Sequence, residues 1–244
     1  MVLDALRGAL GFLTRLPVGR DERAWEAFRR TPAAFPLAGY AVGALLTVPF
    51  LLPGPAPTIA LAFLLSIYLV TGINHADGVA DLGDAAVVHG TPEERREVMR
   101  DTTVGVGALL ALGVVLVGLA LAGLSLAALP LAAAAAVVLA AEVGAKLSMA
   151  FLICLGEPAH EGMGSRFVGR GRRALVWPLL VAFPITLLSL PALAAVAGAA
   201  LSGALLRSWA SHRLGGVSGD VLGAANEVGR VVALHAGVVV WTLS

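Results

Sequence analysis

The chain has 244 residues, of which 58% are hydrophobic and 14% are charged, and its net charge is +1. This composition is far more apolar than that of soluble globular proteins and leaves no room for a separate soluble domain. The small net charge, and the lack of a basic run interleaved with aromatic residues, give no reason to expect nucleic acid as a partner. We therefore expect residues 1–244 to form one integral-membrane domain.

Four stretches of the sequence contain no Asp, Glu, Lys or Arg. A membrane-spanning helix needs only about 20 apolar residues, whereas a soluble core has no use for uncharged runs of roughly twice that length. The pattern predicts an all-α fold, a polytopic bundle of helices in a lipid bilayer. The uncharged stretches are residues 35–74, 102–141, 174–206 and 231–244.

The first 34 residues differ from the rest of the chain because they are rich in arginine. Their apolar side chains recur at helical spacing from Val2 to Leu13, so a helix here would have one apolar and one charged face. Such an amphipathic helix lies in the plane of the membrane interface. We expect residues 1–34 to be a cytoplasmic or interfacial segment that contains this helix.

Prolines and polar segments divide the uncharged stretches into about seven membrane-spanning helices. Residues 174–206 hold either one long helix or two short ones, and Pro191 near their midpoint favours a hairpin. The expected helices cover about 36–52, 58–74, 104–122 and 127–155, two arms within 174–206, and a last helix from about 228 onward.

The distribution of arginine predicts the orientation in the membrane. With seven spanning helices, all arginines fall in four segments on one side, and basic residues are retained on the cytoplasmic side. We expect a multi-pass protein of the cell membrane whose active site faces the cytoplasm. The four segments are residues 1–34, 75–101, 157–173 and 207–230.

Three aspartates follow the second expected helix. Asp77, Asp81 and Asp84 are spaced i, i+4 and i+7, so a helix continuing out of the membrane would place all three carboxylates on one face. Like charges on one face repel each other, and a bound cation would relieve that cost. Carboxylate oxygens favour Mg²⁺, Mn²⁺ or Ca²⁺ over zinc. Gly78 and Gly83 would let a phosphate group approach the backbone closely.

A short helix is well marked after these aspartates. Thr91 fits the N-cap position, Pro92 the first turn and Glu94 the capping box. We expect its charged side chains, Arg95 among them, on solvated or interfacial faces. The helix leads to Asp101, which we expect to come near the other three aspartates. Four aspartates at one membrane mouth suggest a divalent-metal site for diphosphate chemistry, and the alternative is that they are solvated loop charges.

Three further features each allow two interpretations. The arginines of residues 160–173 would clamp phosphates or simply mark the cytoplasmic side. The glycine-rich segment 214–230 is either a functional loop or a flexible turn. Glu142 and Lys146 are spaced i, i+4 in an expected spanning helix, where they face a cavity or form a structural ion pair.

Taken together, these residues resemble the cobalamin (5′-phosphate) synthases, also called adenosylcobinamide-GDP ribazoletransferases, nearly from end to end. The aspartate motif departs mildly from the family pattern at Ala76 and Leu82, where leucine and threonine are usual, and it keeps every carboxylate. The matching segments are FLTRLPV (12–18), FPLAGYAVG (35–43), HADGVADLGDA (75–85), MRDTTVGVGA (99–108), EGMG (161–164) and GGVSGDVLGA (215–224).

The resemblance implies a metal-dependent phosphotransferase. Members of the family join adenosylcobinamide-GDP to α-ribazole, or to its 5′-phosphate, and release GMP with the help of Mg²⁺ or Mn²⁺. The implied metal ligands are Asp77, Asp81, Asp84 and Asp101, and Asp84 or Asp101 would take the proton of the attacking hydroxyl. The expected substrate-binding residues are Gly78, Arg100, Lys146, Glu161, Gly162, Arg166, Ser218 and Asp220, with Arg166 orienting phosphate and Asp220 the nucleoside.

Two rival functions are less well supported. A CDP-alcohol phosphotransferase of phospholipid synthesis has a similar motif, but Asp81 stands here where its DGxxAR pattern has arginine. A divalent-cation transporter would place ionisable groups near the bilayer midplane rather than at a mouth.

Small residues such as Gly113, Gly118 and Gly123 allow close packing within one chain or between copies, so a homo-oligomer stays open. The lower base, and the choice between free and phosphorylated α-ribazole, stay open too.

Overall fold

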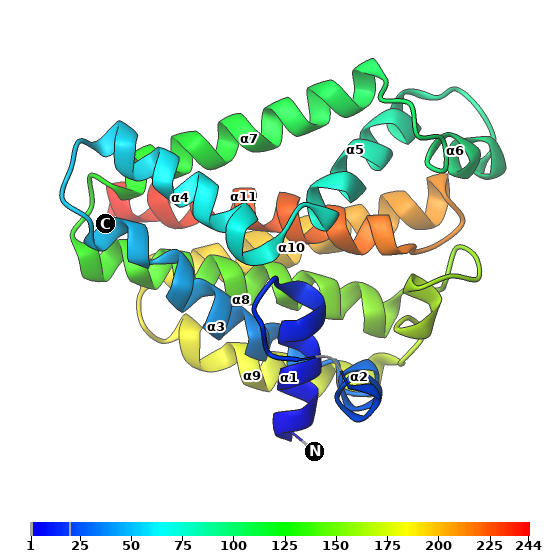
Figure 1. Cartoon of the computed structure of the whole chain (residues 1–244), viewed down its shortest axis with the longest axis horizontal. Helices are drawn as coiled ribbons and strands as arrows, with labels where there is room; N and C mark the ends of the chain where they lie inside the picture. The colour runs from blue at the N-terminus through cyan, green and yellow to red at the C-terminus, as the bar shows by residue number, and fades with distance from the viewer. Residues whose placement is uncertain (1, 20) are drawn as a thin grey trace.

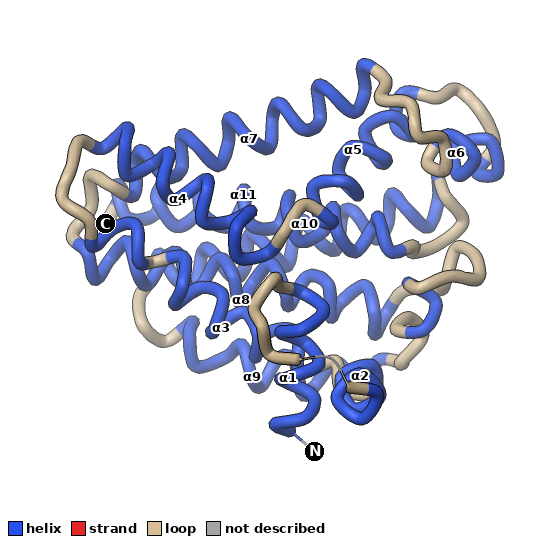
Figure 2. Tube along the Cα trace, in the orientation of Figure 1, coloured by secondary structure: helices blue, strands red, loops and turns tan. Residues whose placement is uncertain are grey.

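The computed structural model describes residues 2–19 and 21–244, so Met1 and Arg20 lie outside the described residues. Within this range the regular structure is helical (Figure 2), which confirms the predicted all-α class. The α-helices are α1 (Val2–Leu13), α2 (Glu22–Arg29), α3 (Ala34–Leu46), α4 (Ala56–Thr71), α5 (Asn74–Val87), α6 (Pro92–Val98), α7 (Val106–Leu126), α8 (Leu131–Leu155), α9 (Val176–Thr186), α10 (Leu190–Arg213) and α11 (Gly219–Leu243). Short 3₁₀ turns cover Val48–Leu51, Gly164–Arg166 and Arg172–Leu175.

Helix α8 is the central element of the bundle. It packs against α3, α10 and α11, and its second half is buried almost throughout. In Figure 1 the long helices α7, α8, α10 and α11 run along the same axis, and α5, α6 and the α8–α9 connection gather near one end. Helices α1 and α2 pack together on one flank, where α1 also contacts α3.

Several helices are suited to a lipid bilayer. Among the described residues, four are long and apolar enough to cross a membrane, or five if α4 and α5 together count as one bent span. The outward faces of α4 and α7 carry many exposed leucines and valines, as lipid-facing helices do. A multi-spanning membrane protein is therefore supported, while the count of seven and the interfacial position of α1 stay predictions. The four are Ala34–Leu51, Val106–Leu126, Leu131–Leu155 and Leu190–Arg213.

Residues 174–206 do contain two helices, but the turn lies earlier than expected. Helix α9 ends at Thr186 and α10 begins at Leu190, so Pro191 occupies the first turn of α10 rather than the bend. Ser189 caps α10 by accepting a hydrogen bond from the backbone N–H of Ala192 at 3.2 Å. Proline suits this position because a first-turn N–H has no helical partner to lose.

The last helix begins well before the residue that we expected. Ser218 accepts a hydrogen bond from the backbone N–H of Val221 at 3.3 Å, and α11 starts at Gly219 rather than near 228. Most of the supposed cytoplasmic segment 207–230 is therefore helical, and Arg230 is fully buried instead of lying in a loop. The prediction for this segment was wrong because polar residues inside a bundle look like loop residues in a sequence.

The aspartate segment is helical as predicted, but α5 does not continue α4. The two helices meet at an angle of 97°. Gly72 follows the last residue of α4 with φ +73, a left-handed conformation that glycine adopts readily. This bend turns α5 across the bundle, where it packs on both α7 and α11.

The capping box of α6 is confirmed. Thr91 accepts from the backbone N–H of Glu94 at 3.3 Å, and the Glu94 side chain accepts from the backbone N–H of Thr91 at 2.7 Å. The expectation that the charged side chains of this helix lie on solvated or interfacial faces is wrong for Arg95. It is buried and donates to the carbonyl oxygen of Ala85 at 2.6 Å, so it holds α6 against the end of α5.

Glycine allows α3 and α8 to pack at very short range. A methyl group added at Gly39 would lie 2.8 Å from both the carbonyl oxygen of Glu142 and the Cα of Val143. Gly118 and Gly123 of α7 likewise face other helices of the same chain, whereas a methyl group at Gly113 would meet no heavy atom within 4 Å. Close approach of backbones through small residues is the usual basis of helix packing in membranes.

We predict that Gly39→Ala destabilises the bundle, because neither backbone atom of α8 can move aside cheaply. The expected loss is about 1–3 kcal/mol, seen as a lower midpoint of thermal unfolding in detergent. Gly113→Ala is the matched control and should leave the midpoint unchanged or slightly higher, since alanine favours helix. Equal midpoints for the two variants would contradict this account of the α3–α8 contact.

Candidate functional site

A cavity of about 850 Å³, here called the central cavity, opens where α1, α2, α5 and α11 meet. Asp77 of α5 and Asp220 of α11 form an acidic edge, Asp21 and Glu22 add carboxylates beside α2, and aromatic rings form another wall. Glycines of α1 and α11 form much of the remaining lining, which leaves space beside the backbone. A cavity of this size with a few polar groups at one edge is typical of a small-molecule site.

The crossing of α5 and α11 sets the acidic edge. A methyl group at Gly78 would lie 2.5 Å from the carbonyl oxygen of Asp220, so the two backbones touch at that point. As a result, Asp220 adds its negative charge to those of Asp77 and Asp84, which act on the half-buried Asp81 from the same helix. The structure thus adds Asp220, which we expected only as a nucleoside contact, to the predicted aspartates.

Asp84 has a structural role that the sequence did not reveal. Its two carboxylate oxygens accept the backbone N–H groups of Gly105 at 2.8 Å and of Ala108 at 2.9 Å. These N–H groups belong to the first turn of α7, which has no other side-chain cap. A carboxylate at a helix N-terminus also benefits from the helix dipole. Asp84 therefore holds α5 to the start of α7.

Asp101 lies apart from this group. It is exposed in the connection between α6 and α7, where it accepts the backbone N–H of Thr103 at 3.1 Å. That hydrogen bond lowers the pKa of the Asp101 carboxyl. Its charge is not among those that act on Asp81, so the expected approach of Asp101 to the other aspartates is not observed.

The donor chemistry at the α5–α11 crossing fits a hard divalent cation. Carboxylates of Asp77, Asp81 and Asp220 supply only oxygen ligands, and their mutual repulsion favours a positive ion among them. Among the described residues, no three carboxylate, imidazole or thiol groups lie close enough to enclose an ion by themselves. Substrate phosphates complete the coordination of Mg²⁺ in many phosphotransferases.

The glycines of the aspartate segment serve helix packing. Gly78 faces α11, and a methyl group at Gly83 would lie 2.5 Å from the carbonyl oxygen of Gly107 in α7. The expectation that Gly78 and Gly83 expose their backbone to a phosphate is therefore wrong for this arrangement. Any side chain at either position would push α5 away from its two neighbours.

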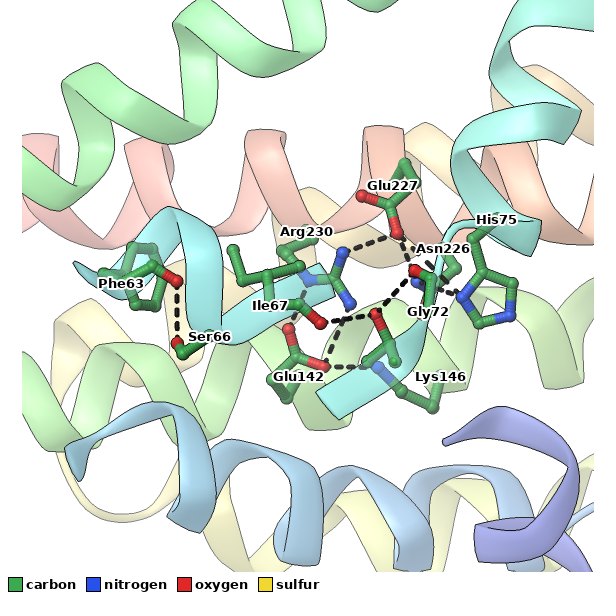
Figure 3. Close-up of polar contacts among 11 residues, drawn as sticks. Phe63, Ser66, Ile67, Gly72, His75, Glu142, Lys146, Asn226, Glu227 and Arg230 are labelled. Atoms are coloured by element: carbon green, nitrogen blue, oxygen red, sulfur yellow. Dashed lines mark hydrogen bonds and ion pairs between the residues drawn. The ribbon is translucent and has the colours of Figure 1, made fainter. Parts of the chain in front are cut away.

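Four charged side chains form an ion-pair network in the middle of the bundle (Figure 3). Glu142 pairs with both Lys146 of its own helix and Arg230 of α11, and the Nη1 of Arg230 donates to Glu227 at 2.6 Å. All four are buried, and their charges cancel. The interpretation of Glu142 and Lys146 as a structural ion pair is thus favoured over one in which they line a cavity.

The network extends to the aspartate helix. Asn226 contributes its amide nitrogen to Glu227 at 3.0 Å and to the Nδ1 of His75 at 3.1 Å, as Figure 3 shows. His75 is one residue into α5 and two residues before Asp77. Its ring also lines the central cavity. The buried charges are therefore linked through one amide to the start of the acidic segment.

A small cavity of about 90 Å³ adjoins the other side of Asp220. It brings together three of the predicted substrate-binding residues, Arg100, Ser218 and Asp220, and adds Arg96. The Ser218 hydroxyl donates to Asp220 at 3.2 Å. The Arg96 guanidinium already pairs with Glu93 and donates to the carbonyl oxygen of Leu214, each at 2.6 Å, whereas Arg100 is exposed. Arg100 is therefore the better placed cation for a phosphate at this end of the site.

Other predicted substrate-binding residues are not brought into these cavities. Lys146 is fully buried and occupied by Glu142. Glu161, Gly162 and Arg166 are exposed in the α8–α9 connection, where neither the central nor the small cavity includes them. The same connection does supply Met163, Gly164 and Phe167 to the central cavity, so the segment contributes through different residues from those expected.

Sequence reasoning did not predict the aromatic wall. The rings of Phe12, Trp25 and Phe167 pack in tilted and edge-to-face contacts at centroid distances of 5.4–5.5 Å, and Phe35 meets Phe167 edge to face at 5.8 Å. They come from α1, α2, α3 and the α8–α9 connection, so only the folded chain assembles them. Only Phe12 stood in a segment that the sequence had marked, the first residue of 12–18. The other rings are far apart in the sequence, so nothing indicated that they meet.

Comparisons with known proteins give one consistent result. Residues 5–238 match the family model described as cobalamin-5-phosphate synthase. The chain is 53% identical to the adenosylcobinamide-GDP ribazoletransferase of Halorubrum lacusprofundi, with 99% of both chains covered. It is 46% identical to that of Haloquadratum walsbyi, with 100% of both covered, and 34% identical to that of Methanocella arvoryzae, with 98% and 97% covered. No solved structure matches the chain.

We predict that Asp84→Ala lowers the thermal midpoint through loss of the α7 cap, by about 0.5–2 kcal/mol of stability. Asp84→Asn should lose less, because the amide oxygen can still accept one N–H group. Glu97→Ala, at an exposed position of α6, is the control and should leave the midpoint in place. An unchanged midpoint for Asp84→Ala would show that α7 does not need this contact.

Proposed function

The chain belongs to the cobalamin-5-phosphate synthase family, and we propose that it joins adenosylcobinamide-GDP to α-ribazole or its 5′-phosphate. The observation that supports this best is the central cavity itself. It combines an acidic edge at Asp77 and Asp220 with an aromatic wall, and the small cavity beside Asp220 adds two arginines. A nucleoside acceptor and a diphosphate donor need these two environments next to each other.

The proposed reaction is a single phosphoryl transfer. A ribose hydroxyl of the ribazole attacks the phosphorus on the cobinamide side of the diphosphate, and the bond from that phosphorus to the bridging oxygen breaks. GMP leaves with the bridging oxygen, and the hydroxyl proton passes to a carboxylate. A bound Mg²⁺ or Mn²⁺ would neutralise the charge that develops on the diphosphate and on GMP.

We assign the proton acceptor and the metal ligands to the α5–α11 crossing. Burial, followed by the negative charges of Asp220, Asp77 and Asp84, raises the pKa of the Asp81 carboxyl to about 6, so a proton or a nearby cation would stabilise this group. Asp77 and Asp220 line the cavity and would hold the cation with it. Asp84 and Asp101, our first candidates for the base, are less suited. Asp84 has both oxygens occupied by backbone N–H groups, and Asp101 lies in an exposed loop.

The central cavity and the small cavity suit different parts of the substrates. A benzimidazole base has no exocyclic amino or carbonyl group, so it can lie against Phe12, Trp25 and Phe167 without stranding a polar atom. Guanine would leave several of its polar atoms without hydrogen-bond partners against these rings. Asp21 offers it little help, because that carboxylate already caps α2 through Ala24 and pairs with Arg7, and Glu22 alone would not satisfy the whole polar edge of guanine. We therefore place the ribazole at the aromatic wall and the diphosphate beside Arg96 and Arg100.

We further propose that this end of the bundle faces the cytoplasm in a cell membrane. Seven spans follow if α3 with its 3₁₀ turn, α4, α7, α8, α9, α10 and α11 each cross the bilayer. The carboxylates and the arginine-rich connections then share the cytoplasmic side, where nucleotide substrates are made.

The first test measures GMP release from adenosylcobinamide-GDP by purified protein in nanodiscs. Asp81→Asn and Asp77→Asn should lower kcat on the order of 100-fold, because they remove charge at the reacting phosphate. Mn²⁺ titration by calorimetry is done without substrate phosphates and again with GDP present. Wild type should bind Mn²⁺ more tightly with GDP than without it, and both variants should weaken this binding. Glu97→Gln, an exposed carboxylate change, is the control and should retain normal turnover.

Three results would overturn the proposal. Near-normal turnover of both aspartate variants would remove the metal role, and CMP release from CDP-diacylglycerol without GMP release would place the chain among the CDP-alcohol phosphotransferases. Uptake of Mn²⁺ into sealed vesicles without either product would favour a transporter.

A second prediction concerns the placement of ribazole. Gly219 lines the central cavity, and a side chain there would meet no heavy atom within 4 Å, so Gly219→Leu would fill space that the acceptor needs. The KM for α-ribazole should rise about tenfold or more while the KM for adenosylcobinamide-GDP changes little. Gly113→Leu, at an equally open glycine of α7, should change neither. A rise in the KM for adenosylcobinamide-GDP alone would reverse the placement of the ribazole and the diphosphate.

A further inference from the structure

A second large cavity, here called the arginine groove, lies between α1, the start of α3 and α9. Its volume is about 730 Å³. Its apolar lining includes Val2 of α1, Leu37 of α3 and Leu180 of α9, and it shares no lining residue with the central cavity. The proposed transfer reaction leaves this groove without a role.

Two arginines stand in the groove, Arg30 after α2 and Arg173 before α9. Both side chains are exposed, so their charged ends are accessible to a ligand. They come from segments about 140 residues apart in the chain. Sequence reasoning could read the arginines near 170 only as a phosphate clamp or a topology signal, because their relation to Arg30 is a product of the fold.

Positive charge is in excess around the groove. Burial, followed by the charges of Arg29 and Arg30, lowers the pKa of Arg170, which shows that the three guanidinium groups are close enough to repel. Glu26 pairs with Arg29 at 2.7 Å and with Arg30 at 3.2 Å, so one carboxylate faces two of these guanidinium groups. A net positive site of this kind favours an anionic group.

The surroundings indicate a position at the membrane interface. Trp177 lines the groove, is 66% exposed and stands one turn after Arg173 at the start of the apolar helix α9. Tryptophan and arginine at the end of an apolar helix are typical of the bilayer surface. A ligand of this groove must therefore present a negative charge at the interface and an apolar chain below it.

We propose that the arginine groove binds an anionic phospholipid. The headgroup phosphate lies between Arg30 and Arg173, and an acyl chain runs along Leu37 and Leu180 between α3 and α9. The lipid fastens α1 and α2, which form one wall of the central cavity, to the bundle at α9. Nucleotide substrates fit less well, because they have no apolar part to cover the lining below the arginines.

The test uses the fluorescence of Trp177 and lipids with brominated chains, which quench tryptophan at short range. Phosphatidylglycerol and phosphatidylcholine are compared in nanodiscs at matched mole fractions. Subtracting the fluorescence of the Trp177→Phe variant from that of wild type gives the signal of Trp177 without the other three tryptophans. Brominated phosphatidylglycerol should quench Trp177 at about tenfold lower mole fraction than brominated phosphatidylcholine, since each arginine near the surface favours an anionic lipid.

The double variant Arg30→Gln and Arg173→Gln should lose this preference. Arg30→Lys with Arg173→Lys should keep most of it, because the charges remain. A matched pair of exposed arginines outside the groove, changed as Arg23→Gln and Arg213→Gln, should keep all of it. Raised salt should reduce the preference of wild type itself, which tests the electrostatic claim even if a variant does not fold.

Three results would overturn the proposal. Equal quenching of wild type by the two lipids would remove the preference for negative charge. A preference that survives in the glutamine double variant would place it elsewhere. Recovery of Trp177 fluorescence on addition of GDP at constant lipid would assign the groove to a nucleotide.

Discussion

The arrangement of the site depends on charged side chains buried where water cannot reach them. Glu142, Lys146, Arg230 and Glu227 form a neutral set in the middle of the bundle, and loss of any one would strand an opposite charge. Breaking such a pair by removing one partner costs about 3–5 kcal/mol, far more than a surface ion pair contributes. The requirement for pairing therefore fixes the register of α11 against α8.

That register determines where the acidic edge lies. Arg230 and Glu227 occupy the middle of α11, so Asp220 comes two turns earlier, beside Gly78 of α5. Asn226 links the same network to His75 at the start of α5. The aspartates of two separate segments thus meet because the buried ion pairs between α8 and α11 allow only one alignment of these helices. Repulsion among the carboxylates is the cost of that alignment, and in the proposed mechanism a bound cation would offset it.

Glycine controls the second constraint, the distance between helices. Gly72 permits the 97° bend that turns α5 away from α4, and Gly78 and Gly83 let α5 pack directly on α11 and α7. The aromatic wall on the opposite side is held by α1 and α2, which contact the bundle chiefly through α3. The central cavity therefore lies between the closely packed α5–α11 crossing and a pair of helices that has fewer contacts with the bundle. Such a division suits an enzyme that must admit two large substrates.

Local properties of the chain were readable from the sequence because they depend on neighbouring residues. Uncharged runs predicted the apolar helices, the spacing of Asp77, Asp81 and Asp84 predicted a helix, and the Thr91 capping box was correct atom by atom. Relations between distant segments were not readable. Polar residues of α11 looked like a loop because their buried partner, Glu142, is 88 residues from Arg230. Asp220, the aromatic wall and the arginine groove each join segments that only helix packing brings together, and so the composition of the site was decided by the tertiary structure.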